Sequence, residues 1–386
     1  MILRSKGTKA SLMVMVVIVS GTAFAFSSSA ANGPPEDNWT VALYIASDNN
    51  LEIAWDMYTL DALLALPKSK SVNMVAMVDL LSTDTIELLE FSGDTYTVVK
   101  TYEDMDTGDG NTFRFFLDEV KTMYPAENTC IVPWDHGGSW IGVCSDDNHD
   151  SIITMEEFST ALTEAALPID VLGLDACLMS SVEVAYEASL SDMVTYMVAS
   201  EKSIPFDGFP YDHMFTPLME DPMATPEELC EMMLAGWDSY YHYGRMVNLV
   251  VTDVRALGDS LPVFQEWSEA LTAGLESNMD AYQTAVESAV SSAYAGYIVD
   301  VHDLCEQLVV LVEDEAVVEA SNAVMVAIEE VVVGLHTSRY VQDMHGLSVW
   351  WTTDNYAWLV PRYMLQVQFA TDSGWGTFQT ALAAAY

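Results

Sequence analysis

Along the first half of the chain, short apolar runs alternate with amphipathic segments of helical length. The apolar runs cover residues 40–46, 72–80, 129–133, 169–174 and 193–200. Their length and the turn-forming residues beside them are typical of buried strands. Because strands that alternate with helices form a parallel sheet with helices on both faces, we predict an α/β fold with a mostly parallel sheet.

The segments between these runs carry helix signals. Helical periodicity covers residues 51–66, 111–124 and 180–189. Thr154 and Glu157 form a capping-box pattern that opens a further helix. One interruption is a predicted hairpin, in which residues 85–89 and 96–102 flank a Ser-Gly-Asp turn.

The second half of the chain has longer helical segments and fewer strands. No repeat or clear linker separates the halves, so we expect one body with a core over 32–220 and a helical or α+β carboxyl-terminal region over 221–386 packed on it. The elements expected there are helices over 226–240, 261–293 and most of 300–336, and strands over 246–252 and 346–351.

The amino terminus is typical of a secretory signal peptide. Three basic residues precede an apolar stretch centred on 12–19, and small residues at 23–25 and 29–31 suit cleavage. The stretch is shorter than the roughly 20 residues that span a bilayer, which disfavours the alternative of an uncleaved anchor. We therefore assign residues 1–31 to a signal peptide and predict a secreted or cell-surface protein without stable membrane insertion.

The charge balance excludes some partners. The chain has 58 acidic and 13 basic residues, for a formal net charge of −45. Such a surface repels nucleic acid and attracts cationic ligands, divalent metals or basic peptides, so we expect no nucleic-acid partner. The simpler reading of the charge is solubility in salty surroundings, and nothing in the sequence indicates an oligomeric state.

A histidine and a cysteine follow two of the predicted strands. His136 comes after the run 129–133, and Cys177 after the run 169–174. The carboxyl ends of neighbouring parallel strands meet at one edge of a sheet, so these side chains can form a base and a nucleophile. A cysteine at a strand end is usually structural when it stands alone, and His149 and His213 are rival bases.

The residues around this pair suit acyl transfer. A helix predicted from Ser180 places its amino-terminal dipole near Cys177, which favours the thiolate. Gly137 lets the backbone approach a substrate closely, so the amides of Gly137 and Cys177 are the predicted oxyanion donors. The alternative for the glycine is a simple tight turn.

Asp135-His136-Gly137-Gly138, together with the Leu-Asp-Ala-Cys-Leu-Met segment over 174–179, resembles the clostripain family of cysteine peptidases, which belongs to the caspase-like clan. The two motifs together are specific, whereas His-Gly-Gly alone is weak. The resemblance covers nearly all of the chain after the signal peptide, with further matches at 39–51, 199–201, 207–211, 346–349 and 374–378.

This resemblance implies a caspase-like sheet and an endopeptidase with a Cys–His dyad that cleaves peptide or protein substrates after Arg or Lys. It also implies that Asp175 and Asp207 line the pocket for the basic side chain. Each acid has a simpler reading, since Asp175 can brace a strand end and Asp207 can make an Asp-Gly turn. The other classes left open are a non-catalytic protein that binds basic peptides and a hydrolase of another amide or ester.

The chain departs from the family in one respect. Members are often processed by their own cleavage between the His and Cys segments, but no Lys or Arg lies between Lys121 and Lys202. We therefore predict an enzyme that acts as an unprocessed single chain. A cut at Lys202 or elsewhere, or a changed specificity, are the alternatives.

The chemistry of a Cys–His dyad requires no cofactor. Some members of the family depend on calcium, and the oxygens of Asp146, Asp147, Asp150 and Glu156 form a candidate Ca²⁺ site. No Cys or His spacing predicts zinc. The five cysteines are too few for a disulfide scaffold, and Cys130 and Cys144 either pair or remain free.

Overall fold

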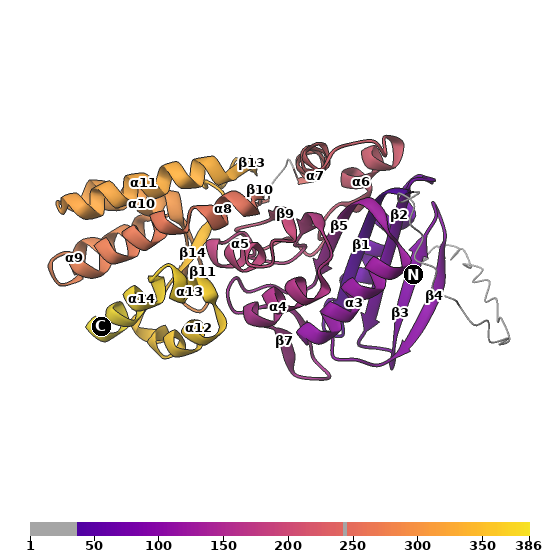
Figure 1. Cartoon of the computed structure of the whole chain (residues 1–386), viewed down its shortest axis with the longest axis horizontal. Helices are drawn as coiled ribbons and strands as arrows, with labels where there is room; N and C mark the ends of the chain where they lie inside the picture. The colour runs from indigo at the N-terminus through magenta and orange to yellow at the C-terminus, as the bar shows by residue number, and fades with distance from the viewer. Residues whose placement is uncertain (1–36, 242–244) are drawn as a thin grey trace, which may run out of the picture. The chain divides into compact units, whose positions relative to one another are not determined.

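The computed structural model describes residues 37–241 and 245–386, so the predicted signal peptide lies outside the described residues. The described residues form one compact unit around a nine-stranded sheet (Figure 1). The strands of this sheet are β1 (Asp37–Ser47), β2 (Val72–Leu80), β3 (Thr85–Phe91), β4 (Tyr96–Glu103), β5 (Ala126–Trp134), β8 (Ile169–Gly173), β9 (Val194–Ala199), β10 (Asn248–Asp253) and β13 (Val332–Thr337).

The strand order is β13-β10-β9-β8-β5-β1-β2-β3-β4. The five central strands, from β9 to β2, pair in parallel, whereas the β3–β4 hairpin and the β10–β13 pair are antiparallel additions at the two edges. The mostly parallel sheet is therefore confirmed. Strands β10 and β13 both follow residue 220, so the two predicted regions share one sheet.

Side chains of β1 alternate between two hydrophobic cores, as the two-residue period of a strand requires. Ala42 and Tyr44 pack on the face covered by α3, α4 and α5, and Val41 and Leu43 pack on the face covered by α2, α6 and α7. These helices are α2 (Leu60–Leu64), α3 (Gly110–Met123), α4 (Met155–Ala165), α5 (Val182–Ser189), α6 (Tyr211–Glu220) and α7 (Pro226–Tyr241).

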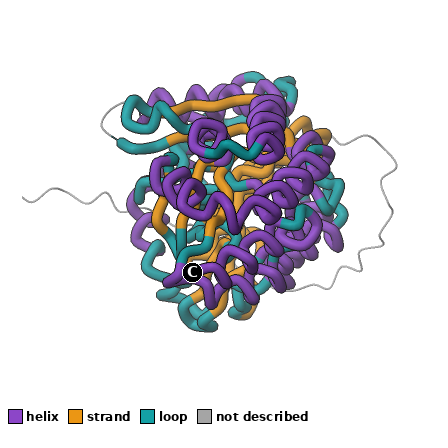
Figure 2. Tube along the Cα trace, turned by 90° about the vertical axis from the view of Figure 1, so that its left-hand side faces the viewer, coloured by secondary structure: helices purple, strands orange, loops and turns teal. Residues whose placement is uncertain are grey.

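Most of the remaining elements belong to the carboxyl-terminal part, whose helices face the viewer in Figure 2. A three-stranded sheet lies there, in the order β11-β12-β14, and a two-stranded ribbon of β6 and β7 lies in the core region. The remaining strands and helices are β6 (Val143–Asp146), β7 (Ser151–Ile153), β11 (Ser291–Ala293), β12 (Tyr297–Asp300), β14 (Ser348–Trp351), α1 (Glu52–Ala54), the π-helical turn η1 (Trp55–Thr59), α8 (Val254–Asp259), α9 (Leu261–Ser288), α10 (Val301–Leu311), α11 (Glu315–Val331), the 3₁₀ turn η2 (Asp354–Leu359), α12 (Val360–Gln366), α13 (Gln368–Asp372) and α14 (Trp375–Ala385).

Two predicted helices extended too far. Helix α9 ends at Ser288, and the residues after it form β11. Helix α11 ends at Val331, and the run Val-Val-Gly-Leu-His-Thr that follows forms the edge strand β13 beside β10. The β-branched residues in this run favour a strand once a partner strand is available, which helical periodicity alone does not reveal.

All five cysteines are free. Cys130 belongs to the hydrophobic cluster on one face of the sheet and Cys144 to the cluster on the other face, so the two do not pair. Within the described residues, no helix combines the length and the apolar character that crossing a membrane requires.

Helix α5 is joined to the carboxyl-terminal region through buried carboxyl groups. Glu183 Oε1 accepts hydrogen bonds from the amide of Trp350 and the hydroxyl of Tyr363, at 2.8 and 3.1 Å. Ser180, just before the helix, receives the amide of Ser348 at its carbonyl at 3.1 Å. The segment that follows Cys177 is thus held by residues far along the chain.

Candidate active site

The two sequence motifs meet at the carboxyl edge of the sheet. Strand β5 runs directly into Asp135 and His136, and a parallel bridge joins Trp134 to Asp175 beyond the end of β8. His136 and Cys177 line one cavity of about 310 Å³ at this edge. The other residues that line it are Asn50, Leu51, Ala54, Trp134, Asp135, Asp175, Ala176, Ile204, Pro205, Phe206 and Gly208.

Gly137 lies directly against the Cys177 loop. A Cβ at this position would lie 2.5 Å from the carbonyl oxygen of Cys177 and 2.9 Å from Ala176 Cβ and Met179 Sδ. Only glycine fits this close approach of two backbones. In the described part of the chain, the amides of Gly137 and Cys177 donate to no protein acceptor, so both remain available to a ligand in the site.

The thiol of Cys177 is held by the loop after β9. Its Sγ accepts the amide of Ile204 at 3.3 Å and lies 3.8 Å from the carbonyl oxygen of the same residue. Leu178, the next residue, has a φ of 65°, which is strained for a leucine and typical of functional loops. Burial raises the pKa of the Cys177 thiol, against the lowered value expected from a nearby helix dipole. Burial is the largest cause of this shift, and α5 starts only at Val182, after its cap Ser181.

His136 is oriented by Asn50, which is not among the predicted site residues. His136 Nε2 lies 3.0 Å from Asn50 Oδ1. In the tautomer that donates this hydrogen bond, Nδ1 is the basic nitrogen. Burial lowers the pKa of His136, so the ring is neutral at neutral pH. No direct hydrogen bond joins His136 to Cys177 among the contacts of the described residues.

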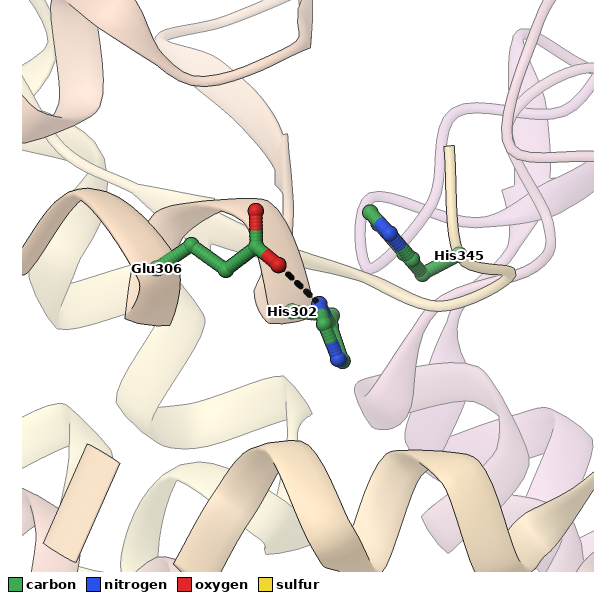
Figure 3. Close-up of side chains that lie close together, drawn as sticks. All are labelled: His302, Glu306 and His345. Carbon is green, nitrogen blue, oxygen red and sulfur yellow. Dashed lines mark ion pairs between the residues drawn. The ribbon is translucent and has the colours of Figure 1, made fainter. Parts of the chain in front are cut away.

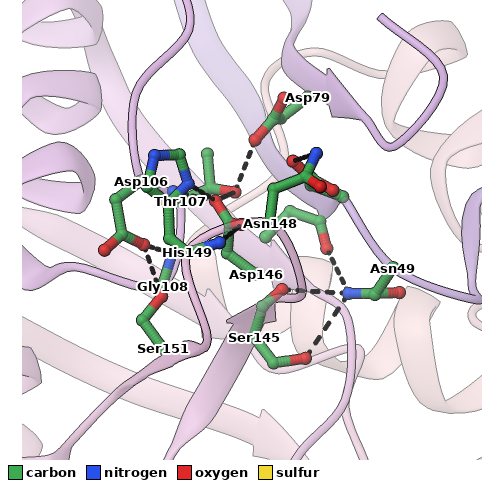
Figure 4. Close-up of polar contacts among 12 residues, drawn as sticks. Asn49, Asp79, Asp106, Thr107, Gly108, Ser145, Asp146, Asn148, His149 and Ser151 are labelled. Carbon is green, nitrogen blue, oxygen red and sulfur yellow. Dashed lines mark hydrogen bonds and ion pairs between the residues drawn. The ribbon is translucent and has the colours of Figure 1, made fainter.

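Asp135 anchors the loop that carries His136. Its carboxylate accepts hydrogen bonds from Asn49 Nδ2 at 2.8 Å and from the amide and hydroxyl of Ser145 at 2.5 and 3.1 Å. Burial raises the pKa of Asp135 to about 7. Asn49 also donates to the carbonyl of Ser145, so the turns after β1 and β5 are joined (Figure 4).

The structure separates the two acids predicted to share a pocket. Asp175 lines the dyad cavity, where its Oδ2 accepts the amide of Phe209 at 2.9 Å and the hydroxyl of Tyr211 at 2.8 Å. Burial raises the pKa of Asp175 to about 7. Asp207 instead lines a neighbouring cavity of about 250 Å³, and its Oδ2 lies 3.6 Å from Arg245 Nη2.

The rival histidines lie outside the dyad cavity. His149 is exposed and pairs through Nδ1 with Asp146 Oδ2 at 2.9 Å, and this hydrogen bond raises its pKa. His213 Nδ1 lies 2.7 Å from Ser239 Oγ. His136 is therefore the histidine that shares a site with Cys177.

A second polar cluster includes Asp79, Asp146 and His149 (Figure 4). Ligand atoms of Asp48, Asp79 and Asp104 lie within 4.8 Å of one another, and so do those of Asp48, Asp146 and His149. One carboxylate oxygen each of Asp48 and Asp79 is buried without a hydrogen-bond partner. Of the four residues predicted to bind calcium, only Asp146 belongs to these groups of described residues.

Comparison with known proteins places this architecture in a family. The model of the clostripain family matches residues 43–346. Clostripain of Hathewaya histolytica is 26% identical over 230 residues, which are 49% of this chain and 43% of that protein, so less than half of the relative is matched.

Solved structures share the fold. A secreted cysteine protease from Bacteroides thetaiotaomicron, in complex with an irreversible peptide inhibitor, matches with a TM-score of 0.68 and 18% identity over 88% of this chain and 99% of its own. An inactive zymogen protease from Parabacteroides distasonis matches with a TM-score of 0.69 and 20% identity over the same shares. These likenesses confirm the predicted caspase-like α/β fold. Since the family model covers most of its length, the chain belongs to the clostripain family of cysteine peptidases.

Proposed function

We propose that the protein is a secreted cysteine endopeptidase that cleaves after Arg or Lys, with Cys177 as nucleophile and His136 as the group that transfers protons. The observation that carries this proposal is the single cavity that both side chains line at the carboxyl edge of the sheet. A thiol and a neutral imidazole in one cavity are the two groups that acyl transfer to cysteine needs.

The reaction proceeds by general-base attack. Because burial raises the pKa of Cys177 and lowers that of His136, both groups are neutral before substrate arrives. As Sγ bonds to the peptide carbonyl carbon, its proton passes to His136, and the amides of Gly137 and Cys177 hold the oxyanion. His136 then gives the proton to the leaving amine, and water hydrolyses the thioester.

Asp175 is the acid that we assign to the basic side chain of the substrate. Asp135 and Asp175 both line the dyad cavity, but the Asp135 carboxylate is held by Asn49 and Ser145. A guanidinium or ammonium that enters this cavity needs a partner, and Asp175 can provide it. Asp207 is already paired with Arg245 in the neighbouring cavity, so its predicted role is the weaker of the two.

Asp175→Asn is expected to lower the selectivity for Arg or Lys over norleucine before the scissile bond by roughly a hundredfold, since one buried ion-pair partner is lost. The selectivity is the ratio of kcat/KM values on fluorogenic peptides that carry Arg, Lys, Asp or norleucine. Asp207→Asn is the matched control and should change the ratio less. Wild-type cleavage without preference for a basic residue would reject the assignment, and an absence of cleavage would favour the basic-peptide-binding protein.

The same assay has a predicted pH dependence. Burial raises the pKa of Asp175 to about 7, so its carboxyl group is mostly protonated at pH 6 and mostly ionised at pH 8. Selectivity for Arg or Lys should therefore rise between these pH values in the wild type and stay flat in Asp175→Asn.

We also propose that the enzyme is active as one unprocessed chain. Lys202 is the first basic residue after Lys121, and its Nζ donates to the carbonyl of Ser291 and the hydroxyl of Ser292 at 3.0 and 3.2 Å. Because these hydrogen bonds hold its side chain against β11, Lys202 is not available to enter a peptidase active site.

Mass spectrometry of the purified active protein should therefore show no cut between His136 and Cys177. The proportion of uncut chain is compared with the proportion of sites titrated by an irreversible peptide inhibitor. Activity confined to a cleaved fraction would contradict the proposal.

We propose further that the acidic cluster around Asp48 binds Ca²⁺. Asp48, Asp79, Asp104 and Asp146 supply the oxygen ligands that this ion prefers, and the unpartnered oxygens of Asp48 and Asp79 fit the need for a cation. Bound Ca²⁺ would fix the turn after β1, which contains Asn49 and Asn50, and would take no part in bond breaking.

Millimolar Ca²⁺ is expected to raise the melting temperature by a few degrees in the wild type and not in Asp79→Asn, since ligand binding to the folded state adds to stability. Asp147→Asn is the matched control, because Asp147 is an exposed acid next to Asp146. This variant should respond to Ca²⁺ as the wild type does. An equal response of all three proteins would place calcium elsewhere.

A further inference from the structure

Two histidines from distant parts of the chain stack on each other in the carboxyl-terminal region. His302 lies in the first turn of α10, and His345 lies in the loop between β13 and β14. Their ring centroids are 4.1 Å apart with an angle of 22° between the planes. Glu306 lies one helical turn after His302 and directs its carboxylate toward it (Figure 3).

The nitrogen atom of His302 that faces Glu306 has no hydrogen-bond partner. Nδ1 lies 3.7 Å from Glu306 Oε1, which is too long for a hydrogen bond, and the side chain of His302 is only 8% exposed. Ligand atoms of His302, Glu306 and His345 all lie within 4.8 Å of one another. A buried unpartnered nitrogen that faces a carboxylate is costly unless a cation lies between them.

Two other nitrogen atoms, Nε2 of His302 and Nδ1 of His345, each face a carboxylate outside this group. His302 Nε2 lies 3.4 Å from Glu329 Oε1 on α11, and His345 Nδ1 lies 3.3 Å from Asp300 Oδ1. These contacts favour a proton on the outer nitrogen of each ring and leave His302 Nδ1 and His345 Nε2 as available electron-pair donors. A carboxylate behind each ligating imidazole is the usual arrangement around protein-bound zinc.

We propose that His302, Glu306 and His345 bind a divalent ion of the zinc class. Two imidazoles and one carboxylate suit Zn²⁺ better than Ca²⁺ or Mg²⁺, which prefer oxygen alone. The carboxylate side of the site is open, since the side chain of Glu306 is 52% exposed, so an ion can enter and water can complete its coordination. The site offers two imidazoles, whereas the groups around Asp48 offer carboxylates and a single imidazole, and it does not depend on the proposed peptidase activity.

The bound ion would join α10 to the loop that supports the nucleophile segment. Gly346, the neighbour of His345, accepts the hydroxyl of Ser180 at its carbonyl at 2.6 Å and donates its amide to Glu201 at 3.1 Å. Both partners belong to the segments that flank the Cys177 loop. The ion therefore has a structural role, as a link between parts of the chain that are distant in sequence.

The test measures Zn²⁺ binding by calorimetry in the Cys177→Ala protein, which lacks the reactive thiol, with millimolar Ca²⁺ present to occupy oxygen-only sites. One Zn²⁺ per chain is expected, together with a visible absorption band when Co²⁺ replaces it. His302→Gln and His345→Gln should abolish this binding. Glu329→Gln, which removes only a carboxylate behind a ligand, should weaken it by about 10- to 100-fold.

His336→Gln is the matched control, because His336 also faces a carboxylate, Asp238 at 3.6 Å, but lies on β13 outside the cluster. Its Zn²⁺ affinity should equal that of the parent. If the buried His302 variant does not fold, the exposed Glu306→Gln variant replaces it, with circular dichroism as the check on folding. An absence of stoichiometric Zn²⁺ binding by the parent, or equal binding by the His345 and Glu306 variants, overturns the proposal.

Discussion

Cys177→Ala is expected to reduce peptide hydrolysis by about four orders of magnitude or more, because Cys177 carries the only thiol or hydroxyl group among the described residues that line the cavity. The substitution removes one sulfur atom whose protein contacts are a 3.3 Å hydrogen bond from Ile204 and a longer contact to its carbonyl. The melting temperature should therefore change little. The measurement is kcat/KM on an Arg-containing fluorogenic peptide, with circular dichroism melting in parallel.

Cys230→Ala is the matched control for this loss. Cys230 is a buried cysteine on α7, in the hydrophobic cluster on the face of the sheet that α2, α6 and α7 cover. Its replacement should cost some stability but leave turnover unchanged. Turnover by Cys177→Ala at the wild-type rate would remove the cysteine peptidase mechanism altogether. Loss of turnover on peptides but retention on simple esters in the wild type would instead favour a hydrolase of another acyl group.

Gly137→Ala is expected to lower kcat/KM by roughly a hundredfold or more without unfolding the protein. The new methyl group would lie 2.5 Å from the carbonyl oxygen of Cys177, so the His136 and Cys177 loops must move apart. A displacement of about 1 Å is enough for a loss of this size, because proton transfer and the oxyanion contacts depend on geometry. The measurements are kcat/KM on the fluorogenic peptide and the melting curve of the same protein.

Gly258→Ala is the control for this glycine substitution. Gly258 lies on α8, and its added methyl group would contact only the side chain of Ser189, at 3.0 to 3.2 Å. Its activity should match that of the wild type. Unchanged activity of Gly137→Ala would show that the close approach of the two loops is not needed for catalysis.

Much of the sheet could be predicted because buried parallel strands have a simple sequence signature. The runs at 72–80 and 169–174 correspond to β2 and β8 within one residue, and the order of strands and helices followed from alternation. The pairing of His136 with Cys177 followed from the same logic, since both come just after strands. Family resemblance added the acids, of which Asp175 lies in the cavity.

The rest depended on contacts between distant residues. Asn50 follows β1 in a segment that the sequence pattern identifies only as a polar turn. This turn lies at the same sheet edge as His136, because β1 and β5 are parallel neighbours. The rule that selected the dyad could have selected Asn50 as well. The pairing of Asp207 with Arg245 and the raised pKa of Cys177 depend on packing and burial, which a linear pattern does not contain.

The hydrogen bonds between the nucleophile segment and β14 also bear on the order of assembly during synthesis. The carbonyl of Ser180 and the carboxylate of Glu183 receive the amides of Ser348 and Trp350, which are made about 170 residues later. A chain that emerges from its amino terminus cannot complete these contacts until Ser348 and Trp350 have been translated. The segment after Cys177 therefore cannot reach its final geometry before β14 has been made, which delays any peptidase activity at least until then.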